Sequence, residues 1–156
     1  MELRKDYEKL KSKYKLPDYD ELDNEFELLY MRDIAEIRFP LRFIRRRIVD
    51  KIVWYCNMIQ SIMQPHAGSL INLQESKFFD ENTRKEMIET LKELMWHERQ
   101  ALYLDTNSDE KEDAKFIVDI FNKWKQVKKQ LIKYAGILRD GWTKETKKEK
   151  GSQYVG

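Results

Sequence analysis

The segment PLRFIRRRIVDKIVWYCNMIQSIM, residues 40–63, constrains the fold of this chain more than any other. Its apolar residues recur at intervals of three and four: Leu41, Ile44, Ile48, Ile52, Tyr55, Ile59 and Ile62. That spacing is typical of one face of an α-helix, and about 24 residues without a turn signal is too long for a strand. Residues 52–56 are apolar on every side. We therefore expect a central helix that is buried on several sides, in the middle of a bundle.

Apolar spacing predicts four more helices around the central one. They cover residues 2–14, 18–37, 80–104 and 108–139. Asp18, followed three positions later by Glu21, is typical of a helix start, and Asp80 and Ser108 are N-cap candidates of the same kind. The last helix carries three apolar heptads, which favour shallow, left-handed packing. Gly141 is expected to stop it.

Two breaks interrupt this series of helices. Pro40 disfavours helix at the residue before it, but the apolar phase continues across it. We predict a kinked, nearly continuous pair of helices there, with a clean corner as the alternative. Residues 65–79 form a long connection with one helical turn near 70–75. Its apolar residues are expected to pack on the core: Leu70, Ile71, Leu73, Phe78 and Phe79.

These elements predict an all-α fold. We expect an antiparallel helical bundle of four long helices plus a short N-terminal helix, kinked or broken near Pro40. A length of 156 residues suits one domain, assigned to residues 1–141, followed by a flexible charged tail over 142–156. Because no run of about 18 apolar residues occurs, we expect no membrane-spanning helix and a cytoplasmic location.

Positive charge is densest at the start of the central helix. The basic residues there are Arg38, Arg42, Arg45, Arg46, Arg47 and Lys51. The arginine fork matches phosphate oxygens, so a solvent-facing cluster predicts binding of nucleic acid or of another acidic partner. The alternative is internal pairing with the acidic helix before Pro40 or with Glu86, Glu89 and Glu93. Aromatic residues do not interleave with the arginines as a base-stacking platform requires.

Two charged residues fall on the apolar side of the helix predicted over 80–104. Glu98 lies between Leu94 and Leu102 on a helical wheel, and Arg84 lies on the same arc. A carboxylate in an apolar interior is costly unless it is paired. Glu98 is therefore the one interior candidate for catalysis or metal binding. An ion pair, for example with an arginine of the 38–47 cluster, is the favoured interpretation.

Other sequence patterns that could indicate a catalytic, metal or cofactor site are weak. The spacing Glu93-x-x-x-His97 departs from the Glu-x-x-His of di-iron bundles, so we expect no metal site, and solvated rings at His97 and His66. Cys56 is expected to be a buried structural thiol. No glycine-rich phosphate loop or catalytic triad spacing occurs. We therefore expect no cofactor and lean against an enzyme.

Three aromatic residues lie off the apolar stripes of their helices. Trp96 and Tyr103 are seven residues apart, and Trp54 lies on the central helix. Tryptophan and tyrosine are favoured anchors of protein–protein contacts. The alternative is that these helices have a second face buried within the domain.

Together these patterns favour a non-enzymatic helical-bundle protein with an interaction or structural role. The partner is a protein, with a homodimer through the aromatic helix faces as the candidate assembly. The alternative is a helical domain that binds RNA or DNA through the arginine cluster 38–47. Membrane binding is not expected, because the basic face lacks an adjoining exposed apolar face.

Overall fold

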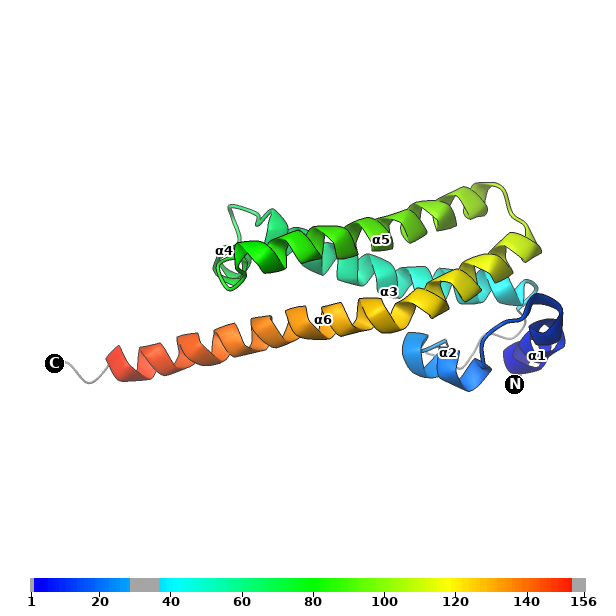
Figure 1. Ribbon diagram of the computed structural model, residues 1–156, viewed down its shortest axis with the longest axis horizontal. Helices are drawn as coiled ribbons and strands as arrows, with labels where there is room; N and C mark the ends of the chain where they lie inside the picture. Colours follow the sequence, from blue (N-terminus) through cyan, green and yellow to red (C-terminus); the bar gives the residue numbers. More distant parts are fainter. Residues whose placement is uncertain (1, 29–36, 153–156) are drawn as a thin grey trace.

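The computed structural model describes residues 2–28 and 37–152. Within these ranges the protein is all-helical, with six helices and no strand (Figure 1). The helices are α1 (Glu2–Tyr14), α2 (Tyr19–Phe26), α3 (Pro40–Met63), α4 (Leu70–Ser76), α5 (Glu81–Thr106) and α6 (Glu110–Ser152). The predicted all-α class is therefore confirmed.

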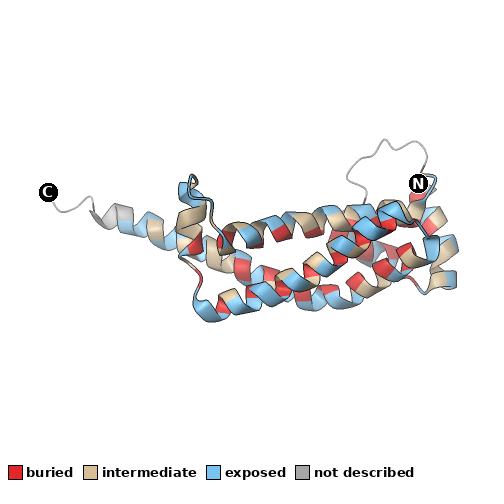
Figure 2. Ribbon diagram, turned by 90° about the horizontal axis from the view of Figure 1, so that it is seen from above, coloured by how far each residue is buried: buried red, intermediate tan, exposed pale blue. Residues whose placement is uncertain are grey.

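The three long helices α3, α5 and α6 form the body of the molecule. Helix α5 runs antiparallel to the other two (Figure 1), and their buried residues face one another (Figure 2). Helix α3 contacts each of the other five helices, so its predicted place in the middle is confirmed. The buried line of α3 is Leu41, Ile44, Arg45, Ile48, Ile52, Cys56, Ile59 and Ile62. The predicted burial of Cys56 is confirmed with it.

The N-terminal helices pack at one end of this body. The side chain of Asp18 accepts hydrogen bonds from the backbone N–H groups of Asp20 and Glu21, as the N-cap prediction requires. The Tyr7 hydroxyl donates to the carbonyl oxygen of Pro17 at 2.8 Å, which ties α1 to the turn before α2.

The predicted long second helix is wrong over the residues described. Helix α2 ends at Phe26 because Glu27 adopts a left-handed conformation with φ of 52°, which closes a helix end. Residues 29–36 of the predicted helix lie outside the described residues. Residues 37–39 are not helical and α3 begins at Pro40, so the alternative of a break replaces the continuous, kinked helix. Pro40 suits the first turn, where its missing N–H needs no partner.

The connection after α3 contains the short helix α4, as predicted near 70–75. Ser69 caps α4 by accepting a hydrogen bond from the N–H of Asn72 at 3.2 Å. Phe79 is buried, but Leu70 and Ile71 are 83% and 61% exposed, so their predicted packing on the core is wrong. Helix α4 turns these two side chains toward solvent.

Helix α6 passes through Gly141 without a break and continues to Ser152, beyond the body of the molecule (Figure 1). The predicted helix end near Gly141 is therefore wrong, and residues 142–152 of the predicted flexible charged tail are helical. A Cβ at Gly141 would overlap the ring of Phe78. The Phe78 ring also meets Trp142 edge-on at 5.6 Å, and the Trp142 indole donates to Glu75 at 2.9 Å. Gly141 makes room for this contact.

The two glycines of α6 provide a matched test of that explanation. Glycine inside a helix costs roughly 0.5–1 kcal/mol relative to alanine. At Gly136 no atom of another element lies within 4 Å of an added Cβ. Gly136→Ala should therefore raise the free energy of unfolding by about that amount, whereas Gly141→Ala should lower it by displacing Phe78. Urea denaturation measures both variants, and an equal gain at both positions would contradict the proposed role of Gly141.

Candidate functional site

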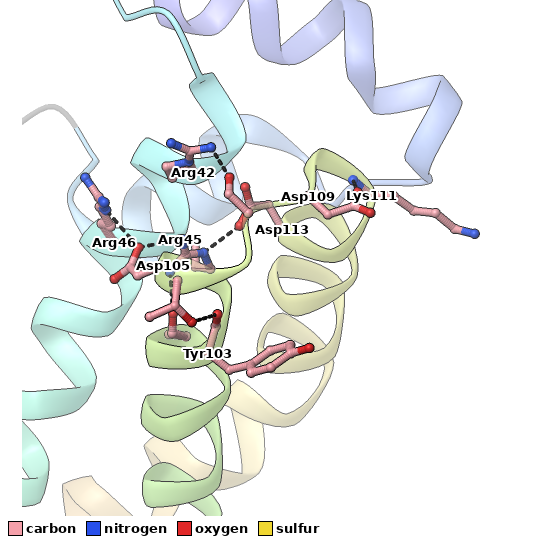
Figure 3. A network of polar contacts seen from close by, with 11 residues as sticks. Arg42, Arg45, Arg46, Tyr103, Asp105, Asp109, Lys111 and Asp113 are labelled. Atoms are coloured by element: carbon pink, nitrogen blue, oxygen red, sulfur yellow. Dashed lines mark hydrogen bonds and ion pairs between the residues drawn. The ribbon is translucent and has the colours of Figure 1, made fainter.

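The structure buries the middle of the arginine cluster. Arg45 is 0% exposed and lies between the end of α5 and the start of α6 (Figure 3). Its Nε donates to Asp113 at 2.6 Å, and its two terminal nitrogens donate to Asp105 at 2.8 Å and to the Ala101 carbonyl oxygen at 3.0 Å. The guanidinium therefore joins three long helices at one end of the molecule.

The pKa values of the two carboxylates bound by Arg45 are shifted in opposite directions, because burial outweighs the effect of the arginines at Asp113 but not at Asp105. Burial raises the pKa of Asp113, and the hydrogen bond from Arg45 only partly opposes that effect. Burial also tends to raise the pKa of Asp105, but hydrogen bonds from Arg45 and Arg46 outweigh it and leave that pKa below its ordinary value. The Asp105 side chain is 37% exposed and that of Asp113 is 4% exposed.

The other members of the basic cluster also have partners. Arg46 donates to Asp105 at 3.1 Å, and Arg47 donates to Asp50 at the same distance. Arg42 donates to the Ser108 hydroxyl, and Lys51 donates to the backbone carbonyl oxygen of Glu25. The Arg38 and Arg42 guanidinium groups lie over the Phe39 ring, at 5.3 and 4.5 Å from its centroid. Of the six residues, Arg38 and Arg46 are exposed.

These contacts favour internal pairing of the arginine cluster over a phosphate-binding surface. Sequence reasoning gave that pairing as the alternative, with the acidic helix before Pro40 or with Glu86, Glu89 and Glu93, whereas the described carboxylate partners of Arg45 are Asp105 and Asp113. Asp113 lies in the first turn of α6, where acidic residues are common, but it also continues the buried line of that helix, at spacings of four and three before Ile117 and Ile120. That spacing is the signal that could have identified it.

The predicted position of Glu98 in the core is wrong by one residue along α5, but the ion pair favoured for it is present, with Arg99 as the partner. The Glu98 side chain is 21% exposed and accepts a hydrogen bond from Arg99 at 3.1 Å. The buried residue is His97, at 0% exposure, so the prediction of a solvated His97 is also wrong. The buried line of α5 is Thr83, Met87, Thr90, Leu94, His97, Ala101 and Leu104.

His97 is held as a neutral ring within the core. Its Nδ1 lies 2.8 Å from the carbonyl oxygen of Glu93, so this nitrogen carries the proton, and its buried Nε2 has no hydrogen-bond partner among the described residues. The ring packs edge-on against Trp96 at 4.9 Å and Phe116 at 5.8 Å. Burial lowers the pKa of His97.

Arg84, the other interior candidate, ties helix ends together. It donates to the carbonyl oxygen and to the hydroxyl of Ser76, the latter at 2.8 Å. It also donates to the carbonyl oxygens of Phe79 at 3.3 Å and Ile62 at 3.5 Å. These carbonyl groups end α3 and α4 or precede α5, which gives Arg84 a structural role.

The three predicted interface aromatics are exposed, but they lie on two separate surfaces. Trp96 and Tyr103 are 55% and 57% exposed on α5. Trp54 is 64% exposed on α3, beside Tyr55 at 4.9 Å, where it lines a hollow with Phe26 of α2. The structure therefore brings Trp96 and Tyr103 together and leaves Trp54 apart.

Two cations that sequence reasoning missed share the exposed face of α5. Lys92, Trp96, Arg99 and Tyr103 follow one another at spacings of four, three and four, and we call these four residues the α5 seam. The side chains of Lys92 and Arg99 are 68% and 63% exposed. Their contacts within the chain are surface ion pairs, with Glu89 at 2.7 Å and with Glu98 at 3.1 Å, which contribute little to stability.

Fold and surface together define an all-helical protein with a three-helix body, a buried arginine cluster at one end and an exposed aromatic helix face. Among the described residues, no helix is long and apolar enough to cross a membrane, and no group of three His, Cys, Asp or Glu side chains could hold a metal ion. No family model matches the sequence, and no curated protein and no solved structure shows significant similarity to it.

Proposed function

We propose that the protein is a non-enzymatic, cytoplasmic interaction protein that forms a homodimer through the aromatic face of α5. The exposure of Trp96 and Tyr103 on one helix face carries this proposal. Each exposes more than half of its surface on a rigid helix that is anchored on its other side by the core. Large aromatic side chains displayed in this way are the anchors that contribute most to protein–protein affinity.

The partners of the arginine cluster support this proposal over nucleic-acid binding. Arg45 is buried, and Arg46 and Arg47 each lie within hydrogen-bond distance of an aspartate. A phosphate group would have to compete with these carboxylates for the same guanidinium groups. The basic cluster therefore acts mainly within the chain, where it fixes α3 against the end of α5 and the start of α6.

Alanine variants of the exposed aromatics test the proposal. We expect light scattering of the full chain to give a mass that rises with concentration toward twice 19.0 kDa. The double variant Trp96→Ala with Tyr103→Ala should weaken the dimer at least about tenfold, because truncating a central aromatic anchor typically costs more than 1 kcal/mol. Circular dichroism should stay unchanged, since both side chains lie outside the core.

Trp54→Ala is the matched control for these variants. Trp54 is similarly exposed but lies on α3, away from the α5 seam. The dimer should survive this substitution. Loss of the dimer in Trp54→Ala with retention in the double variant would assign the interface to α3 and overturn the proposal. A dimer unaffected by all three substitutions would do the same.

A further inference from the structure

The α5 seam alternates cations and aromatic rings. Its order along the helix is Lys92, Trp96, Arg99 and Tyr103, so each ring is followed or preceded by a positive charge. The spacing of four, three and four places all four side chains in a single line, as the seam of a coiled coil requires. The line lies opposite the buried line of α5, which includes Thr90, Leu94 and His97.

This order becomes complementary to itself when a second copy runs antiparallel. If the twofold axis passes between His97 and Glu98, position 96 faces position 99 of the other copy, and position 92 faces position 103. Each tryptophan then meets an arginine, and each tyrosine meets a lysine. Such cation–ring contacts are attractive, and arginine over tryptophan is among the best of them. Pairing is possible without strain because both long cations have flexible, exposed side chains.

A parallel arrangement would reverse the sign of this interaction. In that register every residue of the α5 seam faces its own copy, so Lys92 meets Lys92 and Arg99 meets Arg99. Like charges placed opposite one another are destabilising, and they select against the wrong partner or the wrong orientation. The charge pattern therefore distinguishes between the two orientations.

We propose that the α5 seam binds a second copy of this chain in antiparallel register, with Trp96 on Arg99 and Lys92 on Tyr103 across the twofold axis. This inference rests on the proposed homodimer and specifies how its two copies meet. The same register places Glu89 opposite Thr106 in the next layer, and both residues are exposed. It also places half-buried Met95 near exposed Leu102 along one edge, which adds apolar contact.

Engineered cysteines at Glu89 and Thr106 test the register directly. A Glu89→Cys chain mixed with a Thr106→Cys chain should form a disulfide-linked pair under mild oxidation. Neither chain alone should do so, because positions 89 and 89 of the two copies would lie roughly 25 Å apart at about 1.5 Å rise per residue. Native Cys56 does not interfere, because it is buried and burial raises the pKa of its thiol to about 11.

The outcomes separate failure of the register from failure of the dimer. Cross-linking of either single variant with itself, or a dimer whose mixed variants do not cross-link, would overturn the antiparallel register and leave the homodimer standing. A chain that stays monomeric in the same buffer would overturn both proposals.

Charge reversal provides a second readout in the native background. Arg99→Glu should weaken the dimer about tenfold or more, because it removes two cation–ring contacts per dimer. Arg99→Lys should keep most of the affinity. Arg139→Glu is the matched control and should have no effect, because Arg139 lies on α6, is 78% exposed and pairs with its neighbour Asp140 at 3.0 Å, as Arg99 pairs with Glu98. Equal losses of dimer affinity in Arg99→Glu and Arg139→Glu would contradict the α5 seam.

Discussion

Replacing Arg45 with methionine should lower the free energy of unfolding by about 3–5 kcal/mol, the usual cost of breaking a buried ion pair. Methionine keeps much of the side-chain volume but leaves the carboxylate of Asp113 buried without its 2.6 Å donor. It also removes the donor to the carbonyl oxygen of Ala101. Urea denaturation followed by circular dichroism measures the effect. An unchanged dependence of the unfolding free energy on urea concentration is the check that the variant and the unmodified chain unfold in the same way.

Arg46→Met is the matched control, because Arg46 is the next residue and shares Asp105 with Arg45. Its side chain is 58% exposed, so its removal should cost less than about 1 kcal/mol. The double variant Arg45→Met with Asp113→Leu should recover most of the lost stability, since it removes the buried charge along with its partner. Equal losses in Arg45→Met and Arg46→Met would show that Arg45 is not buried in an ion pair.

Acidification to about pH 5 should destabilise the protein through His97 by up to about 2 kcal/mol, the most that one histidine with an unfolded pKa of about 6.5 can contribute there. Burial places the folded-state pKa of His97 below its ordinary value of about 6.5. Between those two values the unfolded chain binds a proton that the folded chain does not, so stability falls as the pH falls through this window. Above it the ring is neutral in both states and the effect is absent.

The groups around His97 do not cancel this effect. Glu93 on α5, with its carboxylate 3.4 Å from Nδ1, and Asp119 on α6 favour the protonated ring, whereas Lys123 on α6 opposes it. Burial is the largest of these influences and sets the net direction.

Urea denaturation at about pH 8 and at about pH 5 measures the predicted loss of stability. His97→Phe should remove the His97 part of the pH dependence, because phenylalanine fills the same space between Trp96 and Phe116 and binds no proton. A His97→Phe variant with the full pH dependence would contradict the buried neutral ring.

The regular apolar stripe of α3 was enough to predict its bounds, its central place and the burial of Cys56. Helix α5 was harder because it carries apolar residues on several sides. Two of its large apolar residues, Leu102 and Trp96, are exposed, whereas the polar residues Thr90 and His97 are part of its buried line. A core face predicted from the large apolar residues alone is therefore displaced around the helix axis. It places Glu98 in the core, where the structure has His97.

Other differences between expectation and structure depend on contacts between distant segments. Gly141 reads as a helix end locally, but its lack of a side chain accommodates Phe78, which lies 63 positions earlier in the sequence. Glu27 ends α2 in a left-handed conformation that glycine usually adopts, so its residue type gave no signal. For the candidate site, sequence predicted the exposed aromatics, but the matching cations of the α5 seam emerged only when the exposed face of α5 was known.

Sedimentation equilibrium of the unmodified full chain, over a wide range of concentrations, tests the central claim most directly. An interaction protein that binds its own copy through α5 should give a single monomer–dimer equilibrium, with a mass that rises from 19.0 kDa toward twice that value. A mass that stays at 19.0 kDa at every concentration would contradict the account.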